Sequence, residues 1–150
     1  MEVVHSSEAA WVDAVTQGKF GSRRKALGGE KLRASVWELA PGKRSFPLHR
    51  HHGTEEALDA LSGRARVRTE EGETPLGPGD FVCFVAGGVA PQLLNDGPEP
   101  FIYLGLNVSL GVDVVDYPDS GKVACAVGTF PKGKSRIFLE KSQVGYFDGE

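Results

Sequence analysis

The sequence predicts an all-β sandwich or barrel, and three observations support this prediction. Six strand-like apolar runs recur along the chain. The 20 glycines and nine prolines are spread through the 150 residues rather than gathered in one tract. The segments between the runs, such as "APGK" and "NDGPEP", are rich in turn-forming residues. Many short strands separated by turn signals are typical of sandwiches and barrels.

The predicted elements follow one another along the chain. Residues 6–18 predict one helical turn or two, with Ser7 as the N-cap. The basic cluster at residues 23–25 (Arg23, Arg24 and Lys25) is expected in a solvated loop. Strands are predicted over residues 32–39, 56–61, 65–69, 80–85, 101–108 and 122–127. The residues between these strands supply tight turns. Because no repeat or linker stands out, residues 1–150 are expected to form a single domain.

Composition narrows the range of functions. The net charge of -3 and pI near 5.8 disfavour a nucleic-acid partner, which requires a basic surface. No apolar run approaches the roughly 18 residues of a membrane span, and the N-terminus lacks a signal-peptide pattern. Cys83 and Cys125 lie far apart, and Cys83 is expected to be buried in its apolar run. We therefore expect a cytoplasmic protein without a nucleic-acid or membrane partner.

The stretch "PLHRHHGTEEAL" concentrates residues that bind metals. Three of the four histidines fall within residues 49–52. Side chains alternate across a strand, so His49 and His51 should share one face. A turn after them would bring Glu55 or Glu56 back beside the two rings. Two imidazoles and one carboxylate can bind zinc or iron(II). The alternative interpretation is a solvated polar strand end.

Glycines at fixed distances flank this stretch. Gly42 precedes His49 by six intervening residues, and four residues separate His51 from Glu56. Six more residues separate Glu56 from Gly63. This pattern resembles the first sequence motif of the cupin superfamily, and only the first gap differs from it, by one residue.

A second segment resembles the second cupin motif. It supplies Gly79, Gly87 and Asn95 at motif positions. It departs from the motif at Val85, where proline is usual, and at Pro91, where histidine is usual. The two motifs together cover residues 42–95.

The resemblance implies a double-stranded β-helix, or jelly-roll barrel, with a metal near its centre. It selects Glu56 over Glu55 and gives His49, His51 and Glu56 as the metal ligands. The ion would be iron, manganese, nickel or zinc. Residues 1–30 and 118–150 would pack on the barrel or extend it. Cupins commonly dimerise through their sheets, so a homodimer is expected.

The departure at Pro91 leaves two functions open, because proline has no side-chain donor atom. A three-ligand ion would keep open positions for catalysis of the isomerase or dioxygenase type. Loss of a ligand would instead give a metal-free or weakly metallated barrel that binds a small molecule without catalysis. Gln92 or Asn95 could replace the missing donor, whereas strand parity disfavours His52. No catalytic acid or base can be named from the sequence.

The remaining candidates are interpreted as ordinary structural residues. His5 should be exposed. Glu38 and Tyr103 are assigned to a surface ion pair and to the edge of the core. Residues 128–135 match the phosphate-loop pattern GxxxxGK[ST], but that loop requires a following helix and a parallel sheet, so we expect a turn between strands. The glycosylation pattern at Asn107 has no role without secretion.

Overall fold

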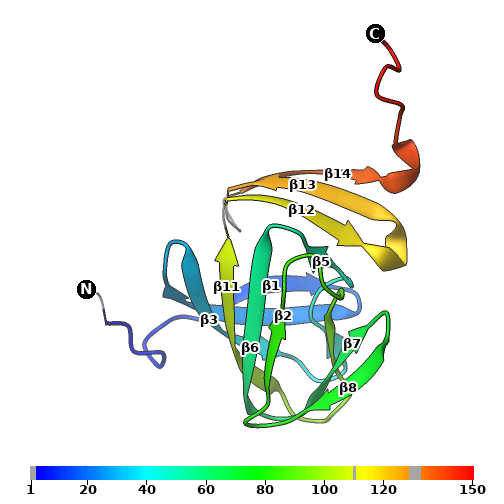
Figure 1. Cartoon of the computed structure of the whole chain (residues 1–150). Coiled ribbons are helices and arrows are strands. Elements are labelled where there is room, and N and C mark those ends of the chain that lie inside the picture. The colour runs from blue at the N-terminus through cyan, green and yellow to red at the C-terminus, as the bar shows by residue number, and fades with distance from the viewer. Residues whose placement is uncertain (1–2, 110, 129–132) are drawn as a thin grey trace.

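The computed structural model describes residues 3–109, 111–128 and 133–150, and its regular structure is almost entirely β. Two strand sets build it (Figure 1). The first has ten strands: β1 (Val12–Gln17), β2 (Phe20–Gly28), β3 (Leu32–Leu39), β4 (Lys43–Arg44), β6 (Thr54–Ser62), β7 (Ala65–Thr69), β8 (Gly72–Leu76), β9 (Phe81–Phe84), β10 (Gln92–Asn95) and β11 (Phe101–Ser109). The second has four: β5 (Arg50–His51), β12 (Val112–Tyr117), β13 (Lys122–Val127) and β14 (Lys134–Leu139). Two 3-10 turns, at Pro118–Ser120 and Glu140–Ser142, complete it.

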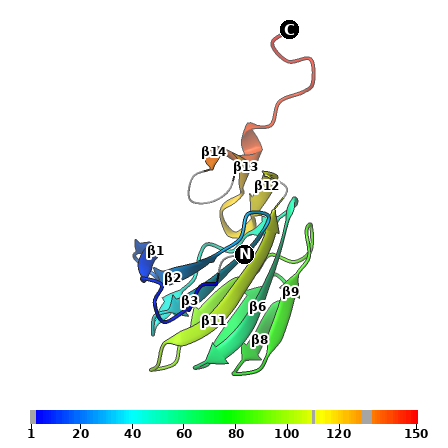
Figure 2. The ribbon, with the colours of Figure 1, turned by 90° about the vertical axis from the view of Figure 1, so that its left-hand side faces the viewer.

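The larger sheet closes on itself. Its strand order is β8-β7-β10-β4-β2-β3-β11-β6-β9, with β1 paired to β2. The two strands at the ends of this order, β8 and β9, are consecutive in the chain and are joined only by residues 77–80. So short a connection requires the two ends of the sheet to meet, and Figure 2 shows β6, β8 and β9 on the same side of the molecule. The fold is therefore the double-stranded β-helix that the sequence predicts.

The core lies inside this curled sheet. Leu58 and Ala60 of β6 are each only 2% exposed, while Asp59 between them points to the other face. The same alternation on neighbouring strands gives a continuous apolar cluster. Its buried members are Leu39, Leu58, Ala60, Ala65, Val67, Leu76, Leu93, Phe101 and Tyr103.

The smaller sheet lies across one end of the barrel (Figure 1). Its strand β5 pairs with β12, with His51 opposite Val115. β5 belongs to the smaller sheet, and the next strand along the chain, β6, belongs to the larger sheet. The histidine segment therefore links the barrel to the C-terminal strands.

All six predicted strands are present. Residues 32–39, 65–69 and 122–127 coincide with β3, β7 and β13, and the other three lie within one or two residues of β6, β9 and β11. Ser135 belongs to β14, so a strand replaces the helix that a phosphate loop requires. Residues 129–132 of that motif lie outside the described residues. No helix among the described residues is long and apolar enough to cross a membrane.

Two local predictions near the N-terminus are wrong. Residues 6–18 form turns and then β1 rather than a helix, because Val12, Val15 and Thr16 pair with β2 and β-branched residues favour strands. The basic cluster at residues 23–25 lies in β2, not in a loop. Arg23 pairs with Glu38 on the outer face, and the side chain of Arg24 reaches the barrel cavity.

The prediction for Cys83 is also wrong, because this thiol is exposed. Its strand β9 lies at the edge of the sheet order and alternates its two faces. Val82 and Phe84 pack against the core, so Cys83 and Phe81 face outward. The apolar run at residues 80–85 therefore does not mark a strand buried on both faces, because its side chains point alternately to the core and to solvent.

Candidate metal centre

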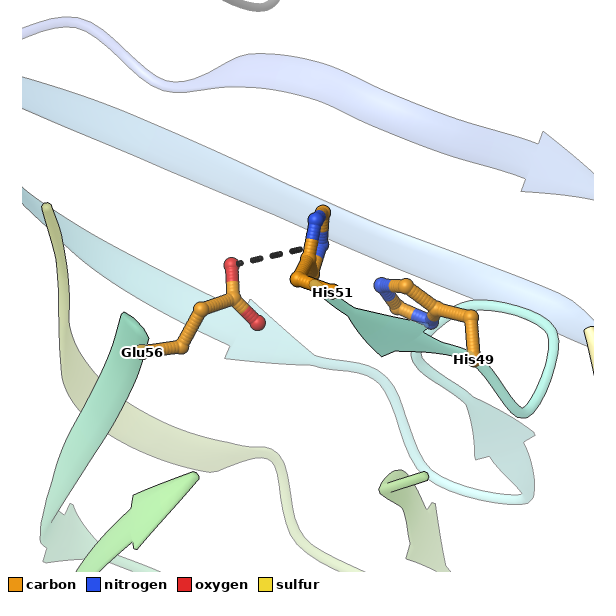
Figure 3. A group of neighbouring side chains, drawn as sticks. All are labelled: His49, His51 and Glu56. Carbon is orange, nitrogen blue, oxygen red and sulfur yellow. Dashed lines mark ion pairs between the residues drawn. The ribbon is translucent and has the colours of Figure 1, made fainter. Parts of the chain in front are cut away.

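Two histidines and one glutamate are brought together by the short connection between β5 and β6. His51 is the last residue of β5, and His49 lies just before that strand. The chain bends at residues 52 and 53, and Glu56 is the third residue of β6. Figure 3 shows the three side chains pointing toward one another.

The donor atoms of these residues form a compact group. Nε2 of His51 lies 4.0 Å from Oε1 of Glu56, and the ring centroids of His49 and His51 are 5.0 Å apart. One donor atom from each residue lies within 4.8 Å of the other two. Two donors bound at right angles to one ion lie about 3 Å apart. Small side-chain rotations would therefore bring this group onto an ion.

Both imidazole rings are held through Nδ1. Nδ1 of His51 lies 2.6 Å from Oδ2 of Asp113, and Nδ1 of His49 lies 2.8 Å from the carbonyl oxygen of Pro47. A carboxylate and a carbonyl oxygen only accept hydrogen bonds, so each Nδ1 carries a proton and donates it. In the neutral rings, Nε2 then keeps its lone pair for a ligand.

Asp113 of β12 is the supporting carboxylate, and the sequence prediction missed it. It is only 8% exposed, and its Oδ1 accepts hydrogen bonds from the backbone N–H groups of His52 and Gly53. Burial alone would raise the pKa of Asp113, but hydrogen bonds from Thr54, Gly53 and His51 lower it overall. The side chain is thus a buried carboxylate that fixes both the bend and the His51 ring. An acidic residue within the apolar alternation "VDVV" is the signal that could have indicated it.

The electrostatic environment keeps His49 neutral. Burial lowers the pKa of His49, and this effect outweighs the opposing influence of the Glu56 carboxylate. A neutral imidazole is the form that binds metals. Tyr117 stacks on the ring, with centroids 5.9 Å apart and planes inclined by 23°.

The three residues open into a cavity of about 410 Å³ inside the barrel. This volume lies in the usual range for small-molecule sites. Aromatic side chains from several strands form part of its wall, and polar side chains line the rest together with small and aliphatic ones. The aromatic members are Trp37, Phe46, Phe84, Tyr103 and Tyr117.

The family model described as "Cupin domain" matches residues 35–108, which contain all three members of this group. The chain holds a small cupin-superfamily domain. No curated protein matches it in sequence.

Solved cupin structures resemble the chain over most of its length. A protein from Acidithiobacillus ferrooxidans, provisionally described as a sugar phosphate isomerase, has 29% identity and a TM-score of 0.73, with 82% of this chain and 80% of that chain covered. A sugar phosphate isomerase from Silicibacter pomeroyi has 19% identity and a TM-score of 0.78, with 95% of each chain covered. A predicted oxalate decarboxylase from Thermotoga maritima has 21% identity and a TM-score of 0.62, with 73% of this chain and 100% of that chain covered.

Gln92 and Asn95, which the sequence offers in place of the missing cupin histidine, already form hydrogen bonds with other protein groups. Pro91 does line the cavity, without a donor atom. The amide nitrogen of Gln92 donates to the carbonyl of Phe46, and its oxygen accepts from Arg44 and Arg68. Asn95 is fully buried and bonds to backbone groups of Leu39, Glu99 and Gly97. Neither amide is available as a fourth donor.

His52, His5 and Glu38 lie where the sequence interpretation expects them, but Tyr103 is not confined to the edge of the core. Nε2 of His52 is 2.7 Å from Asp116, apart from the three-residue group, and His5 is exposed. Glu38 pairs with Arg23 at 2.7 Å. Tyr103 belongs to the core cluster and also reaches the cavity.

The donor set fits a divalent transition ion. Two imidazoles with oriented Nε2 atoms and one carboxylate match the ligand types of zinc and non-haem iron(II) sites. Within residues 3–109, 111–128 and 133–150, this is the one group of three such side chains close enough to share an ion. An ion held there would retain positions open to the cavity.

Proposed function

We propose that this cupin is a metal-dependent enzyme that acts on a small oxygenated metabolite. The observation that carries the proposal is the group formed by His49, His51 and Glu56 at the wall of a cavity large enough for such a molecule. Isomerase chemistry is favoured over dioxygenase chemistry. The reason is the 29% identity to the Acidithiobacillus protein, which is provisionally described as a sugar phosphate isomerase.

The protein's own residues would divide the work of this site. His49, His51 and Glu56 would hold the ion, and Asp113 and Pro47 would fix the two rings. When bound, the ion would supply Lewis acidity that polarises a carbonyl or hydroxyl group. The aromatic wall would exclude water and hold the carbon skeleton of the substrate.

One observation favours the competing function, a barrel that binds a small ligand without catalysis. Pro91 lines the cavity at the position where cupins usually carry a histidine, so an ion would have three protein ligands rather than four. Fewer ligands lower the affinity for a metal. The same substitution also leaves the open coordination positions that catalysis needs, so metal content distinguishes the two functions.

The test is metal content together with thermal stability. Untagged protein is analysed for metals before and after treatment with a chelator, and is melted with iron(II), manganese, nickel or zinc added back. We expect close to one ion per chain and a rise of several degrees in melting temperature with the bound metal. His49→Ala, His51→Ala and Glu56→Gln should each remove the ion and the rise.

His52→Ala is the matched control, because His52 is adjacent in sequence but pairs with Asp116. This variant should keep its metal. Metal far below one ion per chain in the parent protein, with melting unaffected by all four ions, would favour the non-catalytic barrel.

We further propose that the protein is a homodimer through its C-terminal sheet. One face of this sheet is buried at Val115 and Ala124, which are 5% and 3% exposed. Ile137 of β14 continues the same cross-strand row, yet it is 56% exposed. Among the described strands β14 pairs only with β13, so its outer edge is open to a second copy.

A further inference from the structure

The wall of the barrel cavity contains a tyrosine hydroxyl that no protein group meets. Tyr103 of β11 is only 6% exposed, and it lines the cavity. Within residues 3–109, 111–128 and 133–150, no group forms a hydrogen bond with this hydroxyl. Buried tyrosine hydroxyls usually have a partner, because an unsatisfied buried hydroxyl costs about 1–3 kcal/mol. Tyr103 therefore has a hydrogen-bonding capacity that the described part of the protein does not use.

Trp37 supplies a second such group on the neighbouring strand. Trp37 of β3 is opposite Tyr103 in the strand register and lines the same cavity. The two rings stack, with centroids 6.2 Å apart and planes inclined by 7°. The indole N–H of Trp37 likewise has no acceptor among the residues that the structure describes. Because residues directly opposite share a face, the two groups belong to one patch of the wall.

Both groups open onto the cavity and are not sealed inside the protein. In the described part of the chain, two fully buried side-chain polar atoms lack a hydrogen bond, and they are Oγ of Ser22 and Nε of Arg50. The Tyr103 hydroxyl and the Trp37 indole N–H are not among these fully buried atoms, so each keeps some accessible surface. Since both side chains line the cavity, a molecule in the cavity can reach them.

Gly105 of β11 makes room for the indole. A Cβ at Gly105 would lie 2.8 Å from Nε1 of Trp37 and 2.7 Å from Cδ1. The nitrogen-bearing edge of the indole therefore lies directly against β11. Phe46 packs edge-on against the same ring, and the guanidinium of Arg24 lies over it, each 5.6 Å from its centroid. These contacts fix the indole, so its N–H is oriented before a ligand arrives.

The strand register places these groups at a different depth from the proposed metal centre. Gly105 is two residues from Asn107 on β11, and Asn107 is opposite Glu56 of β6. A strand rises about 3.4 Å per residue, so Gly105 and Glu56 differ by roughly 7 Å along the strand direction. The cavity therefore offers its unpaired hydrogen-bonding groups and its proposed metal ligands at two levels, and a small molecule can reach both.

The chemistry of the two groups selects a hydroxylated ligand. The indole N–H only donates, whereas the tyrosine hydroxyl can donate and accept. Burial raises the pKa of Tyr103, and the negative charge of Glu56 raises it further, so the hydroxyl keeps its proton. A ligand hydroxyl can accept from either group and can also donate to the tyrosine oxygen.

We propose that Tyr103 and Trp37 determine substrate specificity by binding hydroxyl groups of a small polyhydroxylated substrate, whose reacting carbon lies at His49, His51 and Glu56. Two neighbouring groups in one wall match hydroxyls on neighbouring carbons. A few placed polar groups in a largely apolar cavity are what orients a small ligand. The position of the reacting carbon rests on the proposed function, whereas hydroxyl binding stands on Tyr103 and Trp37 alone.

The experiment is an NMR titration of the nitrogen-labelled full chain with erythritol and with xylitol. Butanediol and pentanediol that carry hydroxyls only at their two ends are the comparison ligands, because they keep the chain length and lack the inner hydroxyls. Zinc is present throughout, since a filled d shell leaves the spectrum unbroadened. We expect both polyols to shift the indole N–H signal of Trp37 and to bind about tenfold more tightly than the matching diols.

The chain provides an internal control for this signal. It has two tryptophans, and the second, Trp11, contacts Arg23 and Lys25 rather than the cavity. The indole signal of Trp11 should therefore not move with either polyol. A Trp11→Phe variant assigns the two signals.

Tyr103→Phe isolates the hydroxyl, because the variant keeps the stacked ring. We expect its affinity for the polyols to fall about tenfold, to the level of the diols. Its melting temperature should not fall, since the hydroxyl has no partner in the described protein to lose; a purely structural tyrosine would give the opposite pair of results. Tyr146→Phe is the matched control, because Tyr146 is 91% exposed, and it should bind as the parent does.

The inference is overturned if neither polyol moves the Trp37 signal, if the diols bind as tightly as the polyols, or if Tyr103→Phe keeps the parent's affinity. Metal content, measured before zinc is added, separates this outcome from failure of the proposed function. A parent protein that binds polyols through Tyr103 but is purified without metal would overturn the proposed function alone. A metallated parent whose Trp37 signal ignores the polyols would overturn the specificity inference alone.

Discussion

The two carboxylate oxygens of Asp113 accept hydrogen bonds from different groups near the bend between β5 and β6. Oδ2 holds the His51 ring, and Oδ1 accepts from two backbone N–H groups at the bend between β5 and β6. One buried side chain from β12 therefore sets both the orientation of a proposed ligand and the path of the segment that carries it. Such outer contacts commonly determine how tightly a metal is held.

Replacement of Asp113 by asparagine separates the two tasks. The amide oxygen of Asp113→Asn can still accept from the bend, but the charge that orients His51 is lost. We expect metal affinity to fall by about 10- to 100-fold, measured by competition with a chromogenic chelator. Asp116→Asn is the control, since Asp116 contacts the outward-facing His52 and Arg50. Equal affinity in Asp113→Asn and the parent would assign Asp113 to the bend alone.

The residues of the site differ in how readily the sequence reveals them. His49, His51 and Glu56 lie within eight positions of the chain, so strand alternation and one bend suffice to bring them together. Asp113, Trp37 and Tyr103 come from strands distant in sequence. Their place beside the cavity depends on register across several strands, and no local pattern specifies that register.

The turn after β6 shows how an element depends on one glycine. Gly63 has a φ of +77°, and a Cβ there would lie 2.3 Å from the carbonyl oxygen of Pro100. Gly42 also has a positive φ, of +69°, but nothing lies within 4 Å of the position of its Cβ. The two positions therefore share a backbone conformation and differ in crowding.

This contrast gives a paired prediction. Gly42→Ala should lower the free energy of unfolding by about 1–2 kcal/mol, the cost of a left-handed conformation with a side chain. Gly63→Ala should cost about 1–3 kcal/mol more, because the chain must also move away from the Pro100 carbonyl. Urea denaturation of both variants measures the difference. Equal losses of unfolding free energy in the two variants would show that the chain can move away from the Pro100 carbonyl at no cost.

Strands were most predictable where clear turn residues flank a short run of strand-forming residues. β3, β7 and β13 match their predicted ranges, because each combines strand-forming residues with clear turns on both sides. β2 was missed because "FGSRRKALG" mixes glycine and cations, and its strand state depends on pairing with β1 and β3. Local composition cannot encode a strand that its neighbours stabilise.

At the scale of the whole molecule, the C-terminal sheet carries exposed apolar side chains on both faces. Ile137 and Leu139, on one face of β14, are 56% and 44% exposed, and Phe138, on the other face, is 51% exposed. Tyr146 and Phe147, in the segment that leads away from the sheet in Figure 1, are 91% and 77% exposed. Large exposed apolar patches are typical of interaction sites rather than of free surface.

The proposed homodimer is tested through this sheet. The parent should sediment as a dimer at tens of micromolar, and Ile137→Asp should sediment as a monomer, because a charge would replace an apolar contact in the interface. Val114→Ser, on the opposite face of the sheet, should remain a dimer. A monomeric parent, or a dimeric Ile137→Asp, would rule out an interface at this position.

The pairing of β5 with β12 has a thermodynamic consequence. His51 belongs to a strand whose partner is the C-terminal sheet rather than the barrel, and Asp113 approaches it from that same sheet. Binding of an ion at His51 would therefore be coupled to the packing of β12 against β5. Linkage is reciprocal, so whatever tightens the C-terminal sheet, including a second copy of the chain, would also tighten the hold on the ion.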